Sequence, residues 1–550
     1  GSKLLKRLQN KTLGCMGRAR VELREWKWRG KKLAFLAREA PRLPKGCVAW
    51  ELGIDRAGLK VGLKRHSELR ALSEASEMCL ASGAAARQEV VSMAPVAVLG
   101  ACPGDRVLDM CAAPGSKSSQ LLESVRPTSA AVPTSAAHHG LVVANDAGVH
   151  ERMSLLKRIL NARSLAEQAG LILTGGLGEQ LPMMHFDGDA QSQGCFDRVL
   201  ADVPCSGDGT IRKAADVLRR WTPEAAVQLH GVQVELALHG LRLLKVGGTM
   251  VYSTCSLNPI ENEAVVASVL RQAGASAALV QISEQLGNLL ARTGLTTWQV
   301  GEAKAQSNSG KAARCSSSGA GLHMKWYPNF VTAQKAGMSG ATAGMWPPSL
   351  AEAEHMHLEY CRRVLPHDND TGGFFLALLE KRGALPGGNL IRSGAAAEFL
   401  PASRKLSATL CSQVPGLKMD SLAGRIAVSP EDEIVFTPPE LPAMLAAGWP
   451  VIRAGATVAQ RAREPSILTP SGLGLLADLA NSTSPTEEAC VRDGPSPTSM
   501  IRHTEDNTHV KGKAGKRKRA KTANPVVAER QSCNPASQHN MRKEGKRQLA

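Results

Sequence analysis

Short apolar runs of strand length alternate with stretches of helical periodicity between residues 105 and 382. Such alternation is typical of a parallel α/β sheet with helices on both faces. We therefore expect an α/β fold of the nucleotide-binding type, in which ligands bind at the carboxyl ends of the strands. The runs that we assign to strands are Arg106–Asp109, Leu141–Asn145, Leu171–Thr174, Arg198–Ala201, Thr249–Ser253 and Phe374–Leu379.

The pattern changes on both sides of this region. Helical periodicity precedes it, and two further strand candidates, 425–428 and 432–436, follow it. Within it, two stretches rich in Ala, Ser and Gly, 127–139 and 301–321, are expected to be surface insertions. We divide the chain into a basic N-terminal segment (1–45), a helical lead-in (46–99), the α/β domain with the candidate site (100–385), a small α+β domain (390–481) and a disordered basic tail (482–550).

Charge is concentrated at the two ends of the chain. The net charge is +18, and residues 1–45 hold 14 basic against 3 acidic side chains while residues 501–550 hold 13 against 4. Basic ends of this kind favour a polyanionic partner such as RNA, because phosphate contacts release counterions. The alternative is a solvated, flexible tail. The basic cluster 511–521 is typical of a nuclear localisation signal or an RNA-binding arm.

The 13 cysteines show no spacing of metal ligands, so no metal site is expected. No apolar signal region and no run of 18 apolar residues occurs, so neither secretion nor a membrane partner is indicated. We expect an intracellular protein with reduced thiols.

The first candidate site follows the strand at 106–109, in the run Val-Leu-Asp-Met-Cys-Ala-Ala-Pro-Gly-Ser-Lys-Ser that ends at Ser118. Small residues let a cofactor approach the backbone, and the N–H groups at the start of a helix near Ser116 can bind a carboxylate or a ribose hydroxyl. Asp146, at the end of the next strand, is our candidate for the ribose hydroxyls. The alternative for Asp146 is a helix N-cap.

Two cysteines, Cys205 and Cys255, each follow a strand-like run directly. If the strands are neighbours, both thiols face one pocket, which favours chemistry on an unreactive carbon such as C5 of cytosine. Cys255 would attack C6, Cys205 would take the C5 proton, and Asp202 would hydrogen-bond the N3 and N4 edge of the base. The alternative for a single cysteine is an inert, buried apolar side chain.

Together, these motifs closely resemble those of the Sun-domain RNA cytosine-5 methyltransferases. The runs that carry the resemblance are Asp-Met-Cys-Ala-Ala-Pro-Gly-Ser-Lys, Asp-Val-Pro-Cys-Ser-Gly-Asp-Gly-Thr and Tyr-Ser-Thr-Cys-Ser-Leu-Asn-Pro-Ile-Glu-Asn-Glu. The resemblance covers about residues 46–382 and is strongest to the eukaryotic tRNA branch. It implies a Rossmann-like S-adenosylmethionine-dependent methyltransferase sheet.

The family pattern also implies roles for individual residues. Cys255 would be the covalent nucleophile and Cys205 the thiol needed for product release, with Asp202 and Lys117 around the cytosine ring. S-adenosylmethionine would be the cofactor and RNA the partner, tRNA first and rRNA as an alternative, in the nucleus or nucleolus. The cofactor would lie against Cys111, Ala112, Ala113, Pro114, Gly115, Ser116, Lys117, Asp146 and Asp202.

Two departures from the family pattern leave a different class of function open. The acidic residue expected on the adenine side of the cofactor is missing near Gly176, and only Glu179 stands nearby. Residues 1–50 look shortened or diverged. The alternative is therefore a catalytically weak RNA-binding or assembly factor.

Overall fold

The computed structural model describes residues 88–126, 140–148, 165–184, 194–282, 284–305, 322–385, 399–415, 425–429 and 433–460, together with short stretches and single residues between 26 and 78, 156 and 163, and 417 and 476. The predicted insertion 127–139 and the basic cluster 511–521 lie outside these residues. The chain forms two compact units, Gly1–Thr486 and Glu487–Ala550, and everything below concerns the first.

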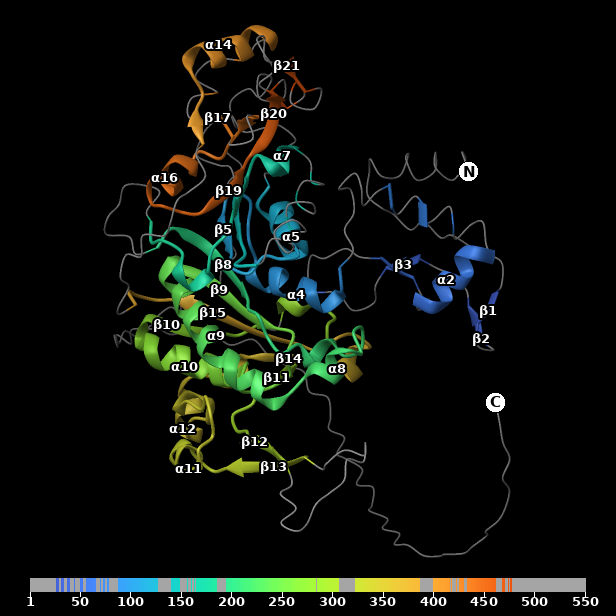
Figure 1. The fold of residues 1–550 in the computed structure, drawn as a ribbon, viewed down its shortest axis with the longest axis vertical. Helices are drawn as coiled ribbons and strands as arrows, with labels where there is room; N and C mark the ends of the chain where they lie inside the picture. Colours follow the sequence, from blue (N-terminus) through green and yellow to red (C-terminus); the bar gives the residue numbers. More distant parts are fainter. Residues whose placement is uncertain are drawn as a thin grey trace, which may run out of the picture. The chain divides into compact units, whose positions relative to one another are not determined.

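A ten-stranded mixed sheet forms the centre of this unit (Figure 1). Five neighbouring parallel strands run in the order β7-β6-β5-β8-β9. Because the order reverses between β5 and β8, the carboxyl ends of these two strands flank a topological switch point, where ligands of doubly wound folds bind. The predicted Rossmann-like α/β fold is confirmed, with strands β5 (Arg106–Asp109), β6 (Leu141–Asn145), β7 (Leu171–Thr174), β8 (Phe196–Asp202) and β9 (Leu244–Thr254).

Antiparallel strands extend the sheet on both sides. Next to β9 lies β15, which pairs with both β14 and β10, and β11 pairs with β14. Beyond β7 lies β19, which comes from the C-terminal part of the chain. These strands are β10 (Ala277–Val280), β11 (Arg292–Thr293), β14 (Arg362–Val364), β15 (Phe374–Lys381) and β19 (Val451–Ala454).

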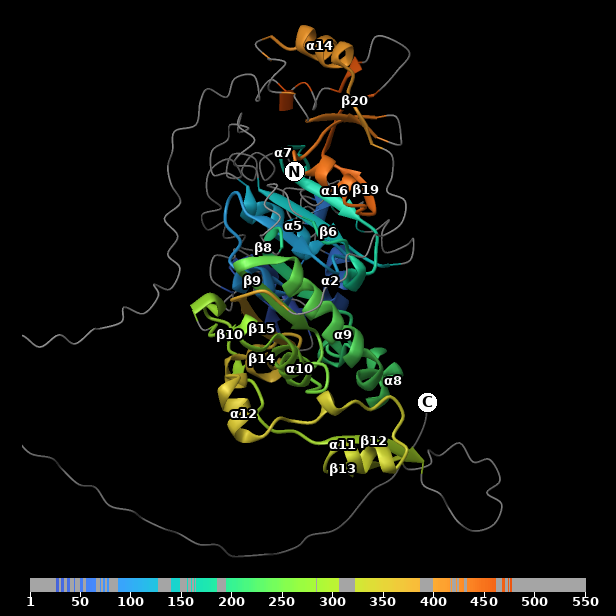
Figure 2. The same cartoon turned by 90° about the vertical axis from the view of Figure 1, so that its left-hand side faces the viewer.

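Helices cover both faces of the sheet, as the alternation of side chains along each strand requires. Leu108 and Val199 point into a cluster with α9 and α10, whereas Val107 and Leu200 point into a second cluster with α4 and α5. Because both clusters are buried, side chains on both faces of these strands are apolar, and each strand is a nearly continuous apolar run in the sequence. Figures 1 and 2 show the two helical layers, which are α4 (Val90–Leu99), α5 (Ser116–Val125), α9 (Pro223–Leu243) and α10 (Glu263–Ala273).

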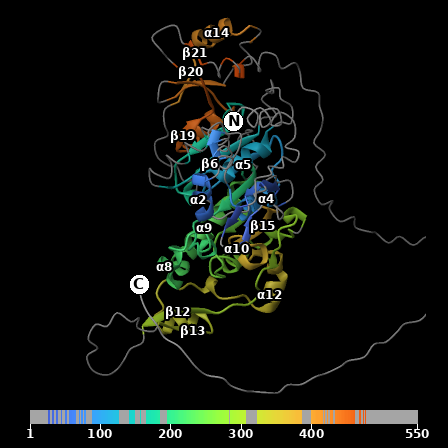
Figure 3. The same ribbon diagram turned by 90° about the vertical axis from the view of Figure 1, so that its right-hand side faces the viewer.

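The C-terminal segment forms its own five-stranded antiparallel sheet, visible beside α14 (Arg404–Gln413) in Figure 3. Its strands are β16 (Leu400–Pro401), β17 (Ile426–Val428), β18 (Glu433–Phe436), β20 (Ala456–Gln460) and β21 (Ile467–Leu468). The same segment also gives β19 to the central sheet and buries Trp449 against Phe196, with ring centroids 5.9 Å apart. The predicted boundary at 390 stays a prediction, but this segment completes the edge of the central sheet.

Local structure departs from expectation in three places. Residues 301–305, expected within an insertion, belong to β12 (Val300–Ala305), which pairs with β13 (Leu322–Tyr327). The strand expected at 249–253 begins five residues earlier, at Leu244, and it contains an irregularity in its register with β8, where Gly247 has φ 82°. Short strands, β1 (Trp26–Trp28), β2 (Lys31–Leu33), β3 (Ala37–Glu39) and β4 (Trp50–Leu52), stand where basic or helical segments were predicted, before α2 (Arg56–Arg65).

Candidate functional site

The structure brings the two predicted thiols together. Cys205 follows β8 and Cys255 follows β9, and these strands are parallel neighbours, so their carboxyl ends meet at one edge of the sheet. The two Sγ atoms lie 3.1 Å apart. Both side chains are only partly exposed. One thiol can therefore donate a hydrogen bond directly to the other.

The surroundings make these thiols unequal. The hydrogen bond from Cys205 lowers the pKa of Cys255, burial and Asp202 raise it, and Lys117 and Lys213 lower it further, so that the net pKa is below its ordinary value. The same hydrogen bond, with burial and the charge of Cys255, raises the pKa of Cys205 well above its ordinary value. The thiolate is the nucleophilic form of cysteine. Cys255 is thus the thiol that loses its proton more readily, while Cys205 keeps its proton.

A partly buried ion pair lies beside the thiols. Lys117 Nζ, from the first turn of α5, lies 2.7 Å from Oδ2 of Asp202 at the end of β8. Burial alone would lower the pKa of Lys117, but the charge and hydrogen bond of Asp202 raise it above the ordinary value. Ser253 Oγ donates to the other oxygen of Asp202 at 2.8 Å. Both charges are therefore held at the strand ends, next to the cysteines.

The predicted cofactor loop connects β5 to α5. Ala112 N–H donates to the carbonyl of Asn145 at 2.7 Å, which holds the loop against the end of β6. Gly115 has φ 105°, a left-handed conformation that glycine adopts without strain. α5 begins directly after it at Ser116, as predicted. The backbone of 111–116 is thus drawn into a tight turn ahead of a helix start.

Asp146 organises this loop. Its carboxylate accepts hydrogen bonds from the backbone N–H of Ala113 at 3.0 Å and of Gly148 at 2.7 Å, and its side chain is buried. The structure therefore gives Asp146 a role that the sequence did not predict, which is to tie the end of β6 to the loop after β5. Its expected contact with ribose stays a prediction.

Asn145 is a residue that sequence reasoning missed. Its side-chain amide donates to the carbonyls of Met110 and Gly176, at 3.0 and 2.9 Å, and accepts from Thr174 Oγ1 and from the N–H of Gly176. It thereby links the ends of β5, β6 and β7. An acid was expected near Gly176, and the structure has a glycine backbone bound to Asn145 there, with Glu179 on the following 3-10 turn, Gly178–Gln180.

Asp109 was missed as well, although it ends β5. It accepts a hydrogen bond from Ser118 Oγ at 2.7 Å, and its second oxygen, Oδ1, is buried without a hydrogen-bond partner among the described residues. Burial raises its pKa to about 7, opposed by the Ser118 bond and Lys117 and supported by Asp202 and Asp146. A buried carboxyl with a strongly raised pKa is a common feature of functional sites.

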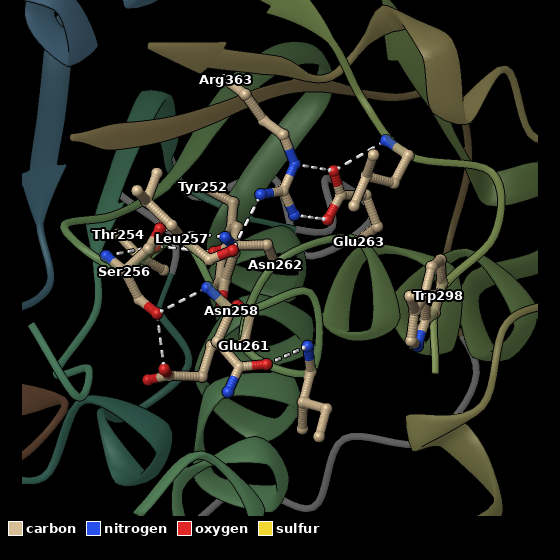
Figure 4. Close-up of polar contacts among 12 residues, drawn as sticks. Tyr252, Thr254, Ser256, Leu257, Asn258, Glu261, Asn262, Glu263, Trp298 and Arg363 are labelled. Atoms are coloured by element: carbon tan, nitrogen blue, oxygen red, sulfur yellow. Dashed lines mark hydrogen bonds and ion pairs between the residues drawn. The ribbon is translucent and has the colours of Figure 1, made fainter. Parts of the chain in front are cut away.

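The segment after Cys255 is fixed by another ion pair, which is buried and is shown in Figure 4. Arg363, on β14, binds the carboxylate of Glu263 at the start of α10, with Nε 2.6 Å from Oε1. It also donates to the carbonyl of Leu257 at 2.8 Å. Thr254 Oγ1 donates to Asn262 Oδ1 at 2.6 Å. This network holds the turn between β9 and α10, and therefore the backbone that carries Cys255.

No group of three or more His, Cys, Asp or Glu side chains suited to a metal ion occurs among the described residues. In the same part of the chain, no helix combines the length and the apolar character that crossing a membrane requires.

The doubly wound sheet and the side chains at its switch point define a Rossmann-like α/β domain with a candidate ligand site at the carboxyl ends of its strands. Residues 96–297 match the family model described as 16S rRNA methyltransferase RsmB/F, which agrees with the resemblance found in the sequence. The model covers less than half of the chain.

Curated relatives agree. The chain is 38% identical over 313 residues to the multisite-specific tRNA:(cytosine-C(5))-methyltransferase trm4b of Schizosaccharomyces pombe, covering 54% of this chain and 42% of the relative. It is 36% identical over 337 residues to the corresponding Saccharomyces cerevisiae protein, covering 61% and 43%. Ribosomal RNA small subunit methyltransferase F of Salmonella arizonae is 38% identical over 183 residues, covering 32% and 33%. The chain thus spans less than half the length of these relatives.

Proposed function

We propose that this protein is an S-adenosylmethionine-dependent RNA methyltransferase that forms 5-methylcytosine, with tRNA as its main substrate. The observation that carries the proposal is the pair of unequal thiols, Cys205 and Cys255, at 3.1 Å beside the Lys117–Asp202 ion pair. Relatives whose names specify tRNA cytosine-C(5) methylation support the choice of substrate.

The residues after β5 fit the cofactor. The first-turn N–H groups of α5 have no helical acceptor and can bind a carboxylate. Gly115 removes side-chain bulk at the turn, and Ala112 and Ala113 add little. The cofactor would lie against residues 111–117, beside Asp146 and Asp202, and would supply an electrophilic methyl group on a sulfonium.

The side chains around the thiols have different roles in the reaction at cytosine. The Cys255 thiolate forms a bond to C6, and the electron pair displaced from the C5–C6 double bond makes C5 nucleophilic toward the methyl group. Asp202, held by Lys117 and Ser253, binds the N3 and N4 edge. Once Cys255 is bonded to C6, its hydrogen bond and charge no longer raise the pKa of Cys205, so Cys205 can give its proton to water. The Cys205 thiolate then takes the C5 proton, the electron pair of the C5–H bond re-forms the C5–C6 double bond, and the Cys255–C6 bond breaks to release the product.

Methyl transfer from labelled S-adenosylmethionine to total tRNA and total rRNA tests the proposal. We expect label in tRNA with the wild-type protein and none with Cys255→Ala. Absence of label in both pools, with RNA binding retained, would contradict the proposal and favour the alternative of an RNA-binding or assembly factor.

Ribosomal RNA is the second candidate substrate. It is supported by the 16S rRNA description of the matching family model and by the small-subunit methyltransferase relatives. Label that appears in rRNA and not in tRNA would favour it, and a transcriptome map of 5-methylcytosine lost on deletion would identify the position.

We also propose a nuclear location, supported by the basic cluster 511–521 in the sequence. A fluorescent fusion is expected to accumulate in the nucleus, and the same fusion without 511–521 is expected in the cytoplasm. Equal distribution of the two fusions would contradict this proposal.

A further inference from the structure

Both cysteines are followed by a serine, and the two serines bind the same carboxylate oxygen. Ser206 Oγ donates to Glu261 Oε2 at 2.5 Å, and Ser256 Oγ donates to the same atom at 2.6 Å. The two hydroxyl oxygens lie 3.3 Å apart. A single side chain therefore joins the loop after β8 to the loop after β9, one residue beyond each thiol.

The other oxygen of this carboxylate holds the first loop a second time. Ser206 N–H donates to Glu261 Oε1 at 2.7 Å, and Gln233 Nε2, from α9, donates to it at 3.2 Å. Gln233 also donates to the carbonyl of Pro204 at 2.9 Å. The residues on both sides of Cys205 are thus fixed, and Glu261 has four donors for its two oxygens. Charge-assisted bonds of this kind are short and strong.

Glu261 is itself held in place, as the Glu261 side of the network in Figure 4 shows. Its side chain is fully buried, and its carbonyl accepts a hydrogen bond from Tyr252 OH at 2.5 Å. Ser256 Oγ also accepts from the N–H of Asn258 at 3.0 Å. A buried carboxylate with this many donors keeps one position, so the loops that it joins are held at one separation.

The charge of Glu261 also acts on the thiols. It raises the pKa of Cys205, after the larger effects of the bond to Cys255, burial and the charge of Cys255, and Asp202 acts in the same direction. The main cationic influence, from Lys117 and Lys213, falls on Cys255. Negative charge behind one thiol and positive charge beside the other support the direction of the hydrogen bond between them.

We propose that Glu261 is a positioning residue that sets the separation of Cys205 and Cys255 by holding Ser206 and Ser256 on one carboxylate. This inference rests on the proposed function for the roles of the two thiols. The effect of Glu261 on their separation can be tested without RNA or cofactor. The loss of the Glu261 bridge lets the two loops move apart, which weakens the hydrogen bond from Cys205 to Cys255.

The test separates the effect of the length of the Glu261 side chain from the effect of its charge. Glu261→Asp keeps the charge and shortens the side chain, so it cannot hold both serines. Glu261→Gln keeps the length and removes the charge, and its amide can donate to both serine oxygens. Ser206→Ala removes one contact and carries the test if a Glu261 variant fails to fold. Glu235→Gln, at an exposed position of α9, is the control for loss of a negative charge.

Two readouts on the folded protein follow the thiols. The first is the equilibrium constant for the Cys205–Cys255 disulfide in a glutathione buffer, measured by mass spectrometry of the linked peptides. Oxidised glutathione takes up the two electrons and two protons that the thiols release. The second is the pH profile of Cys255 alkylation by iodoacetamide.

We expect Glu261→Asp and Ser206→Ala to lower the disulfide constant about tenfold, from the loss of a charge-assisted hydrogen bond. They should also shift the alkylation profile of Cys255 to higher pH. Glu261→Gln should keep the constant within about threefold, on the same scale, and shift the profile to lower pH. A merely structural role would not give shifts of opposite sign.

Wild-type values of both readouts in folded Glu261→Asp and Ser206→Ala would overturn the inference. If instead the thiol readouts change as expected and the wild-type protein transfers no methyl group to RNA, the proposed function fails while the positioning role of Glu261 stands. If the wild-type protein transfers methyl groups to RNA and the Glu261 and Ser206 variants keep wild-type thiol readouts, the proposed function stands and the positioning role of Glu261 fails.

Discussion

Lys117 and Asp202 form an ion pair of 2.7 Å that joins the start of α5 to the end of β8. The two residues are far apart in sequence, and they meet because β5 and β8 are parallel neighbours whose carboxyl ends lie at one edge. The pair connects the loop predicted to bind the cofactor with the loop that carries Cys205. Lys117 Nζ also lies 5.5 Å from the centre of the Phe374 ring, which helps to shield it from water.

Replacement of Lys117 by Met is expected to lower kcat/KM for methyl transfer by about 100-fold, a typical loss for a charged group in an active site. The partner Asp202 would then stand half-buried without its cation. Because Lys117 also lowers the pKa of Cys255, alkylation of Cys255 should need higher pH in this variant. An alkylation profile identical to that of the wild type would contradict this role.

Substitutions of the two cysteines should block the reaction at different steps. Cys255→Ala is expected to abolish both turnover and the covalent protein–RNA adduct, because it removes the proposed nucleophile. Cys205→Ala should form the adduct and release it poorly, so that a denaturing gel shows protein that stays linked to RNA. Cys411→Ala, in the C-terminal segment, is the control. Equal behaviour of the first two variants would contradict the assigned roles.

Asp109 should make stability depend on pH. Its pKa is about 7 in the folded protein and near the ordinary 3.8 when unfolded, so the folded state binds more protons between these values. Stability is then full below the unfolded pKa and is lost as pH rises through the folded pKa, on the order of 4 kcal/mol for a shift of this size.

Asp109→Asn removes the titration and keeps the shape of the side chain. Relative to this variant, the free energy of unfolding of the wild type in urea should fall between pH 5 and pH 8. A constant difference between the two proteins across this range would show that Asp109 does not titrate there.

Gly209 should tolerate no side chain. A Cβ at this position would lie 2.6 Å from the carbonyl oxygens of both Cys255 and Gly373. Gly209→Ala is therefore expected to destabilise the protein by about 1–3 kcal/mol, as overpacking does, and to lower methyl transfer by displacing the backbone of Cys255.

Gly231 offers a matched control, because a Cβ there would meet nothing within 4 Å and the residue lies within α9. Gly231→Ala should stabilise the protein by about 0.5–1 kcal/mol. Thermal unfolding and methyl transfer measured on both variants check this pair, and a loss of activity in both would point to a cause other than the contact at Cys255.

The strands and the candidate thiols were predictable because their signals are local. Each parallel strand is buried on both faces, so it is a continuous apolar run such as Leu141–Asn145, and it was placed correctly. Short motifs at strand ends likewise identified Cys205 and Cys255. Their meeting at one edge followed from the geometry of parallel strands alone.

Other features depend on partners distant in sequence. Residues 301–305 look polar and small, and they form a strand only because β13 pairs with them. The apolar run at 451–454 gives no sign that it joins β7. The sequence assigned no role to Glu261, Asn145 or Asp109, because the burial and the contacts of these side chains are set by the fold.

The sequence by itself determined the α/β sheet and the two cysteines, because periodicity and strand-end motifs are written in neighbouring residues. Only the tertiary structure decided the hydrogen bond between the thiols, the Lys117–Asp202 pair and the bridge through Glu261. Each of these requires atoms from different loops to lie within about 3 Å, and hydrogen-bond geometry of that accuracy is set by the packing of the whole domain.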